Sequence, residues 1–198
     1  MLVIGVSGTK RSGKNTFAEY VKQHLEEQGK SVKVGSWAEL LKKSAYESLG
    51  FASNLENSIY ELWADAFKQG HKIEIINSIG ETIHSISGRE FLQRYGTEGH
   101  REVFGDNFWI DQLWEANDFS GLDVFIIADC RYDNEAENVL NKNGVIIKID
   151  NPHTEKNRDS HASEQGISEH LITYNIANDS DLEGFKKKSI ELIEEIYG

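Results

Sequence analysis

The sequence predicts a three-layer α/β/α fold, in which helices cover both faces of a mainly parallel sheet. Three short apolar runs indicate buried strands: Leu2–Val6, Val124–Ala128 and Val145–Ile149. Helical patterns separate these runs along the chain, and such alternation favours parallel strands joined by helices. A chain of 198 residues, 38% of them hydrophobic, is long enough to bury one core of this kind.

The other elements follow from weaker patterns. Ser31–Gly35 alternates between apolar and polar residues, and Asn175–Asn178 adds a last short strand. The predicted helices are Asn15–Gln28, Ala38–Leu49, Arg89–Gly96, Asn134–Asn143 and Leu182–Ile196. Phe51–Ser87 shows no strong strand signal, so we expect it to be helical and to lie outside the sheet. The sequence therefore predicts one domain with a core of residues 1–36 and 120–198 and a helical region of about 37–119.

A polar stretch interrupts the second half of the predicted core. Asn151–Gly166 contains the only proline and few apolar residues, which favours a mobile loop or lid of about residues 151–169. A solvated connector fits the same composition, and both interpretations remain open.

Charge and cysteine content narrow the class of protein. The net charge of −12 argues against stable nucleic-acid binding, which normally requires a broad basic surface. Cys130 is the only cysteine, so an intrachain disulfide and a cysteine-rich metal site are excluded, as expected of a protein in a reducing cytoplasm. The run Leu2–Val6 is too short for a secretion signal, and no apolar stretch approaches the roughly 20 residues that span a bilayer.

A glycine-rich segment joins the first predicted strand to the first predicted helix. It reads GTKRSGKNT, and Gly8-x-x-x-x-Gly13-Lys14 has the spacing of a phosphate-binding loop, or P-loop. Glycines let the backbone curl so that several N–H groups point inward at the positive end of the helix. Lys14 would then reach the outer phosphates of a nucleotide. The strand, loop and helix context favours a nucleotide site over a chance glycine–lysine turn.

Asn15 occupies the position at which most P-loops have a serine or threonine. That hydroxyl normally binds magnesium, whereas an amide offers a neutral carbonyl oxygen or holds a water. Thr16 follows and can donate its hydroxyl to a phosphate. We interpret Asn15 as an altered metal contact in a working loop.

Cationic and polar residues gather in the middle of the chain, between Ser87 and Trp109. On a helix, Arg89, Gln93 and Gly96–Thr97 share one face, which would suit a second phosphate and the edge of a base. The alternative is a helix that packs its aromatic residues inward while its arginines form surface ion pairs. Taken alone, the segment favours this alternative.

The third motif follows the strand Val124–Ala128. Asp129 lies at the carboxyl end of this strand, with Arg131 just beyond, and this edge faces the ligand crevice in open α/β sheets. Asp129 can hold magnesium through water, and Arg131 can neutralise a transferring phosphate. The alternative for Asp129 is a helix cap with a surface salt bridge, although Asp133 or Asn134 is better placed to cap the next helix.

Seven segments, in this order, resemble one family of enzymes. They are GTKRSGKNT, WAELLKKS, GREFLQRYGTE, FGDNFW, ADCRYDNEAE, HASE and IANDSDLEGF. The series is similar to that of the deoxynucleoside monophosphate kinases of tailed phages, a branch of the nucleoside monophosphate kinase-like P-loop enzymes. This resemblance implies transfer of the terminal phosphate of ATP to a deoxynucleoside monophosphate, with Mg²⁺. It also implies a core, a monophosphate-binding region and a lid.

The resemblance and the motifs together give a set of candidate site residues. The catalytic candidates are Lys10, Arg11, Lys14 and Arg131. The ATP-binding candidates are Gly8, Arg11, Ser12, Gly13, Lys14, Asn15, Thr16 and, in the lid beside His161, Arg158. The monophosphate-binding candidates are Lys10, Trp37, Lys42, Arg89, Gln93, Gly96, Thr97, Arg101, Trp109, Asp129 and Arg131. The candidates for metal binding are Asn15 and Asp129, directly or through water.

Two departures from the family pattern limit which residue roles can be transferred from the family to this chain. The family commonly has aspartate at the position of Asn15, so the metal arrangement is open here. Many relatives have an aspartate–proline pair where this chain has Glu39–Leu40, so base contacts at that point do not transfer.

Three functions fit these observations. The first is a deoxynucleotide kinase acting on small nucleotides as a monomer or homodimer, in the host cytoplasm if a phage encodes it. The second is a P-loop kinase of another small phosphorylated metabolite. The third is a non-enzymatic nucleotide-binding or DNA-associated module, which the acidic charge disfavours.

Overall fold

The computed structural model describes residues 1–49, 70, 72–154 and 166–198. The chain divides into two compact units. The first unit comprises Met1–Trp37 and Leu113–Gly198, and the second comprises Ala38–Gln112. Predictions that concern residues 50–69, 71 or 155–165 lie outside the described residues.

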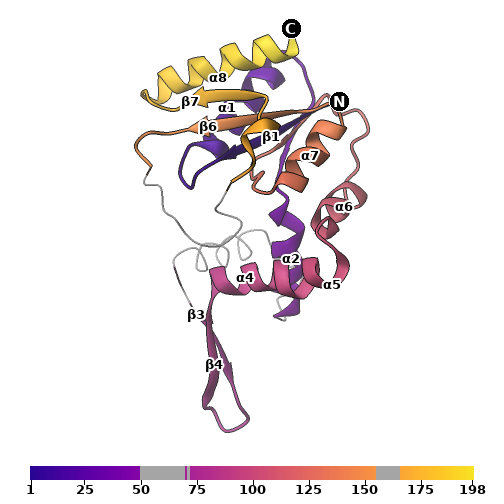
Figure 1. The fold of residues 1–198 in the computed structure, drawn as a ribbon, viewed down its shortest axis with the longest axis vertical. Helices are drawn as coiled ribbons and strands as arrows, with labels where there is room; N and C mark the ends of the chain where they lie inside the picture. The colour runs from indigo at the N-terminus through magenta and orange to yellow at the C-terminus, as the bar shows by residue number, and fades with distance from the viewer. Residues whose placement is uncertain (50–69, 71, 155–165) are drawn as a thin grey trace. The chain divides into compact units, whose positions relative to one another are not determined.

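The first unit is built on a five-stranded sheet in the order β2-β5-β1-β6-β7 (Figure 1). Its strands are β1 (Leu2–Gly8), β2 (Val32–Gly35), β5 (Val124–Ile127), β6 (Val145–Asp150) and β7 (Tyr174–Ala177). Every pairing between them is parallel, so all five carboxyl ends meet at one edge of the sheet. The predicted parallel sheet and its five strands are confirmed.

Helices cover both faces of this sheet. The helices α1 (Lys14–Glu27) and α8 (Leu182–Tyr197) pack on one face, and α7 (Asp133–Asn141) packs on the other (Figure 1). A 3-10 turn at Glu169–Leu171 leads into β7. The three-layer architecture is therefore confirmed, with β1 at the centre and the glycine-rich loop directly after it.

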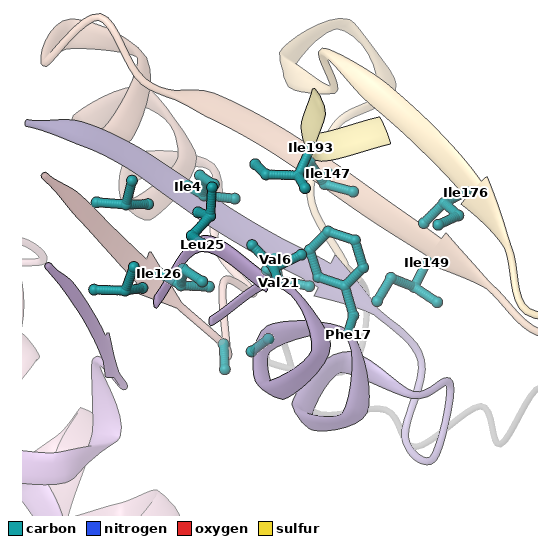
Figure 2. Packing of buried hydrophobic residues seen from close by; sticks show 14 of the residues in the cluster. Ile4, Val6, Phe17, Val21, Leu25, Ile126, Ile147, Ile149, Ile176 and Ile193 are labelled. Carbon is teal, nitrogen blue, oxygen red and sulfur yellow. The ribbon is translucent and has the colours of Figure 1, made fainter. Parts of the chain in front are cut away.

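The main hydrophobic core fills the space between the sheet and α1 (Figure 2). Phe17, Val21 and Leu25 lie on one face of α1 at helical spacing, and at most 2% of each is exposed. They pack against alternate residues of the strands, among them Ile4 and Val6. Burial of each large side chain contributes about 1.5–3 kcal/mol, so the start of α1 is held firmly on β1.

The second unit begins with α2 (Ala38–Ser48) and continues with a β-hairpin. Its strands are β3 (Lys72–Ile76) and β4 (Thr82–Ser87), which pair antiparallel. The helical prediction for Phe51–Ser87 is therefore wrong over residues 72–87. The turn chemistry accounts for this, because the Asn77 side chain accepts hydrogen bonds from the backbone N–H groups of Ile79 (3.1 Å) and Glu81 (2.9 Å). The β-branched residues on either side of that turn favour strands.

Helical segments complete the second unit. They are α4 (Gly88–Gly96), a π-helical turn (Thr97–Arg101) and α5 (Glu102–Phe104), while α6 (Phe108–Glu115) crosses into the first unit. The Ser87 hydroxyl accepts from the backbone N–H of Glu90 at 3.1 Å and caps the start of α4.

Across the described ranges, no helix combines the length and apolar character that a membrane span requires.

Candidate phosphate-binding site

The backbone of the glycine-rich loop needs glycine at both ends. Gly8 has φ 144° and Gly13 has φ 107°, values that L side chains rarely adopt. A Cβ on Gly8 would lie 2.5 Å from the carbonyl oxygen of Ile149, and one on Gly13 would lie 2.6 Å from Nδ2 of Asn178. Conformation and space therefore both explain the two glycines of the motif.

The loop delivers the chain directly into α1. Gly13 is the N-cap of this helix, and no side chain of the described residues caps its first N–H groups. No acidic residue lies in the first turn either. Since the first N–H groups of a helix carry partial positive charge, this terminus is suited to an anion.

The Lys14 ammonium group folds back over the loop. Its Nζ donates to the carbonyl oxygens of Gly8 and Thr9, each at 2.7 Å. The positive charge is thus held beside the N–H groups of the loop rather than extended into solvent. Lys10 and Arg11 are exposed on the same loop, and Arg11 has a left-handed φ of 64°. Asn15 is exposed and Thr16 is half-buried in the first turn of α1.

Ser12 lies inside the loop. It is fully buried, and its Oγ has no hydrogen-bond partner among the described residues. A Cβ on Gly8 would lie 2.6 Å from this oxygen, so the hydroxyl is packed close to the first glycine. An unpaired buried hydroxyl is uncommon and costs about 1–3 kcal/mol.

The carboxylate of Asp129 lies at the end of β5 and connects it to the end of β2. It accepts hydrogen bonds from the Ser36 hydroxyl at 2.6 Å and from the backbone N–H of Trp37 at 2.8 Å. Asp129 thus bonds to the two residues that directly follow β2. Sequence reasoning missed Ser36, although its place at the end of β2 was a usable signal.

Trp37 itself lies in the interior. Only 3% of it is exposed, and its ring packs edge-on against Trp114 with 6.3 Å between the ring centroids. The Trp37 side chain is therefore buried, whereas its backbone N–H, which donates to Asp129, lies at the edge of the sheet. Next to it, burial raises the pKa of the Cys130 thiol well above its ordinary value, and the nearby carboxylates of Glu135 and Asp129 add to the effect.

Arg131 is exposed just before α7. Its backbone N–H donates to the Glu135 carboxylate at 2.8 Å, and so does that of Tyr132 at 3.2 Å. Tyr132 is the N-cap of α7, so the prediction that Asp133 or Asn134 caps this helix is wrong. Glu135 folds back from the third helical position and accepts from the N–H groups of the N-cap residue and of the residue before it, as the glutamate of a capping box does.

Asp133 has a different partner. Its carboxylate accepts from the Ser168 backbone N–H at 2.7 Å and from the Ser168 hydroxyl at 2.6 Å. These two hydrogen bonds lower the pKa of Asp133, because they favour its charged form.

The second unit brings together several of the predicted monophosphate-binding residues. Arg89 is exposed at the start of α4, and Gln93 and Thr97 are half-buried on the same segment. Gly96 is buried against Leu41 of α2, where a Cβ would overlap the leucine side chain. Its carbonyl oxygen accepts from Nε1 of Trp109 at 3.1 Å. Gly96 and Trp109 therefore position the helix.

The π-helical turn carries an aromatic cluster around His100. The His100 ring lies 4.5 Å from the Tyr95 ring and 4.7 Å from the Trp109 ring, measured between centroids. Its Nδ1 is 2.7 Å from the Tyr95 carbonyl oxygen. Lys42 on α2 and Arg101 in the turn are half-buried in this unit. The expected surface ion pair exists for Arg94, whose Nε is 3.0 Å from a Glu98 carboxylate oxygen.

The predicted lid residues Lys156, Arg158 and His161 lie outside the described residues. Sequence reasoning also missed Asn178, which donates from Nδ2 to the Ser12 carbonyl oxygen at 2.8 Å. No periodicity or short motif links two residues 166 positions apart.

Comparison with known proteins decides the family. Residues 38–189 match the family described as deoxynucleotide monophosphate kinase. The chain belongs to this family. Its members are phosphotransferases by name, and the resemblance predicted from the seven segments is confirmed.

The individual relatives have low sequence identity to this chain. The deoxynucleoside-5'-monophosphate kinase of Escherichia phage T5 is 31% identical over 103 residues, which are 48% of this chain and 41% of the phage protein. The chain thus matches less than half the length of that relative. A protein of Acanthamoeba polyphaga mimivirus, provisionally named a deoxynucleotide monophosphate kinase, is 26% identical over 98% of this chain and 97% of its own.

Solved structures with detectable similarity include two other kinases. Dephospho-CoA kinase from Campylobacter jejuni has a TM-score of 0.46 at 16% identity and covers 98% of this chain and 96% of its own. Mycobacterium tuberculosis APS kinase, in complex with AMPPNP and APS, has a TM-score of 0.42 at 14% identity, covering 98% and 97%. We assign the fold from the strand order and parallel pairings of the chain itself.

The oxygen ligands that this chain offers suit a magnesium ion that is held mainly by bound phosphates. In the ranges described, no three acidic, histidine or cysteine side chains converge as a metal site would require. The Asp129 carboxylate lies after β5, where it accepts hydrogen bonds from the Ser36 hydroxyl and the Trp37 backbone N–H. Since Mg²⁺ keeps several waters and is usually held by phosphates with one or two carboxylates, Asp129 and the Asn15 amide oxygen fit an indirect role.

Proposed function

We propose that this protein transfers the terminal phosphate of ATP to a deoxynucleoside monophosphate, giving ADP and a deoxynucleoside diphosphate. The observation that carries this proposal is the glycine-rich loop, in which Lys14 is held at 2.7 Å from two loop carbonyl oxygens beside an uncapped helix terminus. Family membership supports the choice of acceptor.

The proposed reaction is an in-line displacement. An oxygen of the acceptor monophosphate attacks the terminal phosphorus of ATP, and the bond from that phosphorus to the bridging oxygen of ADP breaks. Because the acceptor phosphate is already ionised at neutral pH, the reaction needs positioning and charge neutralisation more than a general base.

The residues of the first unit have separate roles in this proposal. The N–H groups of Gly13 to Thr16 hold the ATP phosphates, and the Lys14 ammonium group neutralises charge on the outer ones. Lys10 and Arg11, both exposed on the loop, and Arg131 add cationic groups for the transferring phosphate. Asn15 and Asp129 would hold magnesium, directly or through water, and the ion would supply charge neutralisation at the phosphates.

The residues of the second unit are proposed to bind the monophosphate. Arg89 offers a planar set of donors that matches phosphate, and Gln93 on the next turn of α4 can bond to the edge of a base. Lys42, Thr97 and Arg101 lie in the same unit as further donors. Arg158 is kept as a proposed ATP contact from the segment outside the described residues.

An ADP-release assay tests the proposal directly. Purified protein is incubated with ATP, Mg²⁺ and each of dAMP, dCMP, dGMP and dTMP, and ADP is measured by a coupled enzyme system. We expect ADP to form with at least one of the four. No ADP with any of them would contradict the proposal.

A second candidate acceptor, another small phosphorylated metabolite, is separated by ligand stabilisation. A ligand that binds only the folded state raises the melting temperature by an amount that grows with the ratio of its concentration to its Kd. We expect deoxynucleoside monophosphates to raise it more than phosphorylated sugars or isoprenoids. The reverse order would favour the second candidate.

A further inference from the structure

The phosphate-binding loop is held from outside by a residue near the carboxyl terminus of the chain. Asn178 follows β7 and donates from Nδ2 to the Ser12 carbonyl oxygen at 2.8 Å. Its own backbone N–H donates to the Asp150 carbonyl oxygen at 2.8 Å, at the end of β6. Asn178 is therefore fixed to the sheet and extends its amide group to the loop.

This hydrogen bond sets the direction of one peptide group. Because a trans peptide is planar, its C=O and N–H groups point in opposite directions. The Ser12 carbonyl points to Asn178, so the Gly13 N–H points away from Asn178. Phe185 of α8 lies on the Asn178 side, since a Cβ on Gly13 would be 3.3 Å from its ring and 2.6 Å from Nδ2 of Asn178. The Gly13 N–H thus points away from the packed side of the loop.

We propose that Asn178 is a positioning residue for ATP, which holds the Ser12–Gly13 peptide so that the Gly13 N–H faces the bound phosphates. This inference rests on the proposed use of the loop for ATP. Inward-facing N–H groups of a glycine loop are what bind phosphate oxygens. A peptide held in advance in the required orientation loses less conformational freedom on binding than one free to rotate.

Gly13 and Asn178 depend on each other in this arrangement. Glycine at position 13 leaves room for the Asn178 amide group, and the amide group in turn stabilises the left-handed conformation that glycine permits. The residue acts through the backbone of the loop, and its removal leaves every proposed ligand side chain in place.

Three variants of the full-length protein test the proposal: N178A, N178H and, as a matched control, N175A. Alanine removes the donor, whereas histidine returns an N–H donor at a similar distance from the backbone. Asn175 is an exposed asparagine on β7, three residues earlier. Titration calorimetry measures the Kd of AMPPNP with Mg²⁺ and the Kd of the monophosphate substrate, and thermal melting reports the fold.

We expect N178A to raise the Kd of AMPPNP about tenfold, as loss of one well-placed hydrogen bond predicts. The Kd of the monophosphate should stay within twofold of the wild-type value, and N178H should recover most of the AMPPNP affinity. N175A should bind both ligands as the wild type does. If N178A does not fold, N178S replaces it, because a serine hydroxyl is too short to reach the Ser12 carbonyl oxygen.

Two results would overturn the proposal. One is a wild-type Kd for AMPPNP in N178A or N178S. The other is an equal loss of affinity for both ligands with no recovery in N178H, which would make Asn178 a general structural contact. A wild-type protein that binds no AMPPNP would instead refute the proposed function, so the two failures are distinguishable.

Discussion

The two units fix their proposed ligand-binding groups in different ways. In the first unit the groups are mostly backbone N–H groups, and their direction depends on left-handed glycines and on contacts from distant parts of the chain. In the second unit they are side chains, among them Arg89 and Gln93 of α4, and this helix is positioned by close packing at Gly96. Gly13 has φ 107°, whereas Gly96 has an ordinary helical φ of −72°. Glycine is thus required for both conformation and space at position 13, and for space alone at position 96.

The largest expected effect tests the charge in the loop of the first unit. We expect Lys14→Ala to lower turnover about 10²- to 10³-fold, because a preorganised donor to developing phosphate charge is lost. The melting temperature should change little, since the hydrogen bonds from Nζ to the Gly8 and Thr9 carbonyl oxygens lie in a part-buried to exposed loop outside the hydrophobic core. Activity comes from the ADP-release assay and stability from thermal melting.

Lys22→Ala is the matched control for this prediction. Lys22 lies on the same helix, and its side chain is 36% exposed and 4.0 Å from Glu26. Surface pairs of this kind contribute little, so both readouts should stay at the wild-type level. Wild-type turnover in Lys14→Ala would refute the role of Lys14, whatever the control shows.

The next effect concerns packing in the second unit. Gly96→Ala places a methyl group against Leu41, and overpacking of this kind costs about 1–3 kcal/mol. Because the backbone of Gly96 is helical, we expect the cost to be smaller in a Leu41→Ala background, where the space is available. Chemical denaturation of the four proteins of this double-mutant cycle measures the coupling. Purely additive costs would show that Gly96 is needed for another reason.

This contrast also explains how far the sequence could be interpreted without coordinates. Buried strands such as Val124–Ile127 were predictable because they are short continuous apolar runs between turn signals. The loop was predictable because its glycines allow the positive φ angles that the local backbone needs. Asp129 was correctly placed at a strand end, but its bonds to Ser36 and Trp37 join residues more than 90 positions apart.

The second unit was less predictable for the same reason. The hairpin of β3 and β4 depends on the side chain of Asn77 and on pairing of two weakly apolar strands, which a search for apolar runs overlooks. The π-helical turn after α4 has no sequence signature, since its shape depends on contacts such as that of Trp109 with Gly96. Local chemistry was therefore visible in the sequence, and contacts that cross the chain were not.

A smaller effect is expected from a substitution inside the loop of the first unit, at Ser12. Ser12→Ala removes a buried hydroxyl that has no partner in the described part of the chain. We expect the nucleotide-free protein to be as stable as the wild type or more stable by about 1 kcal/mol, because an unsatisfied polar group is lost. If bound phosphate supplies the missing partner, ATP should raise the melting temperature less in the variant.

Thermal melting with and without AMPPNP measures both parts of that prediction. A variant that is less stable without nucleotide would show that the hydroxyl already contributes to the fold. Equal stabilisation by AMPPNP in both proteins would show that the Ser12 hydroxyl does not contact the nucleotide.

The smallest effect concerns a surface contact of the first unit, where a side chain again joins distant segments. The hydrogen bonds from Ser168 lower the pKa of Asp133, so the folded state favours the carboxylate. The contribution of this group is therefore present above the pKa of the unfolded chain, about 3.9, and is lost as the pH falls through the lower pKa of the folded state. We expect Asp133→Asn to lower the melting temperature slightly at pH 7, and we expect this difference to shrink as the pH falls below about 3.9. Ser168→Ala supplies the control: it removes the hydroxyl bond and keeps the backbone N–H bond, so Asp133→Asn should have a smaller effect in that background. A difference between Asp133→Asn and the wild type that stays constant over this pH range would contradict the role of the charged form.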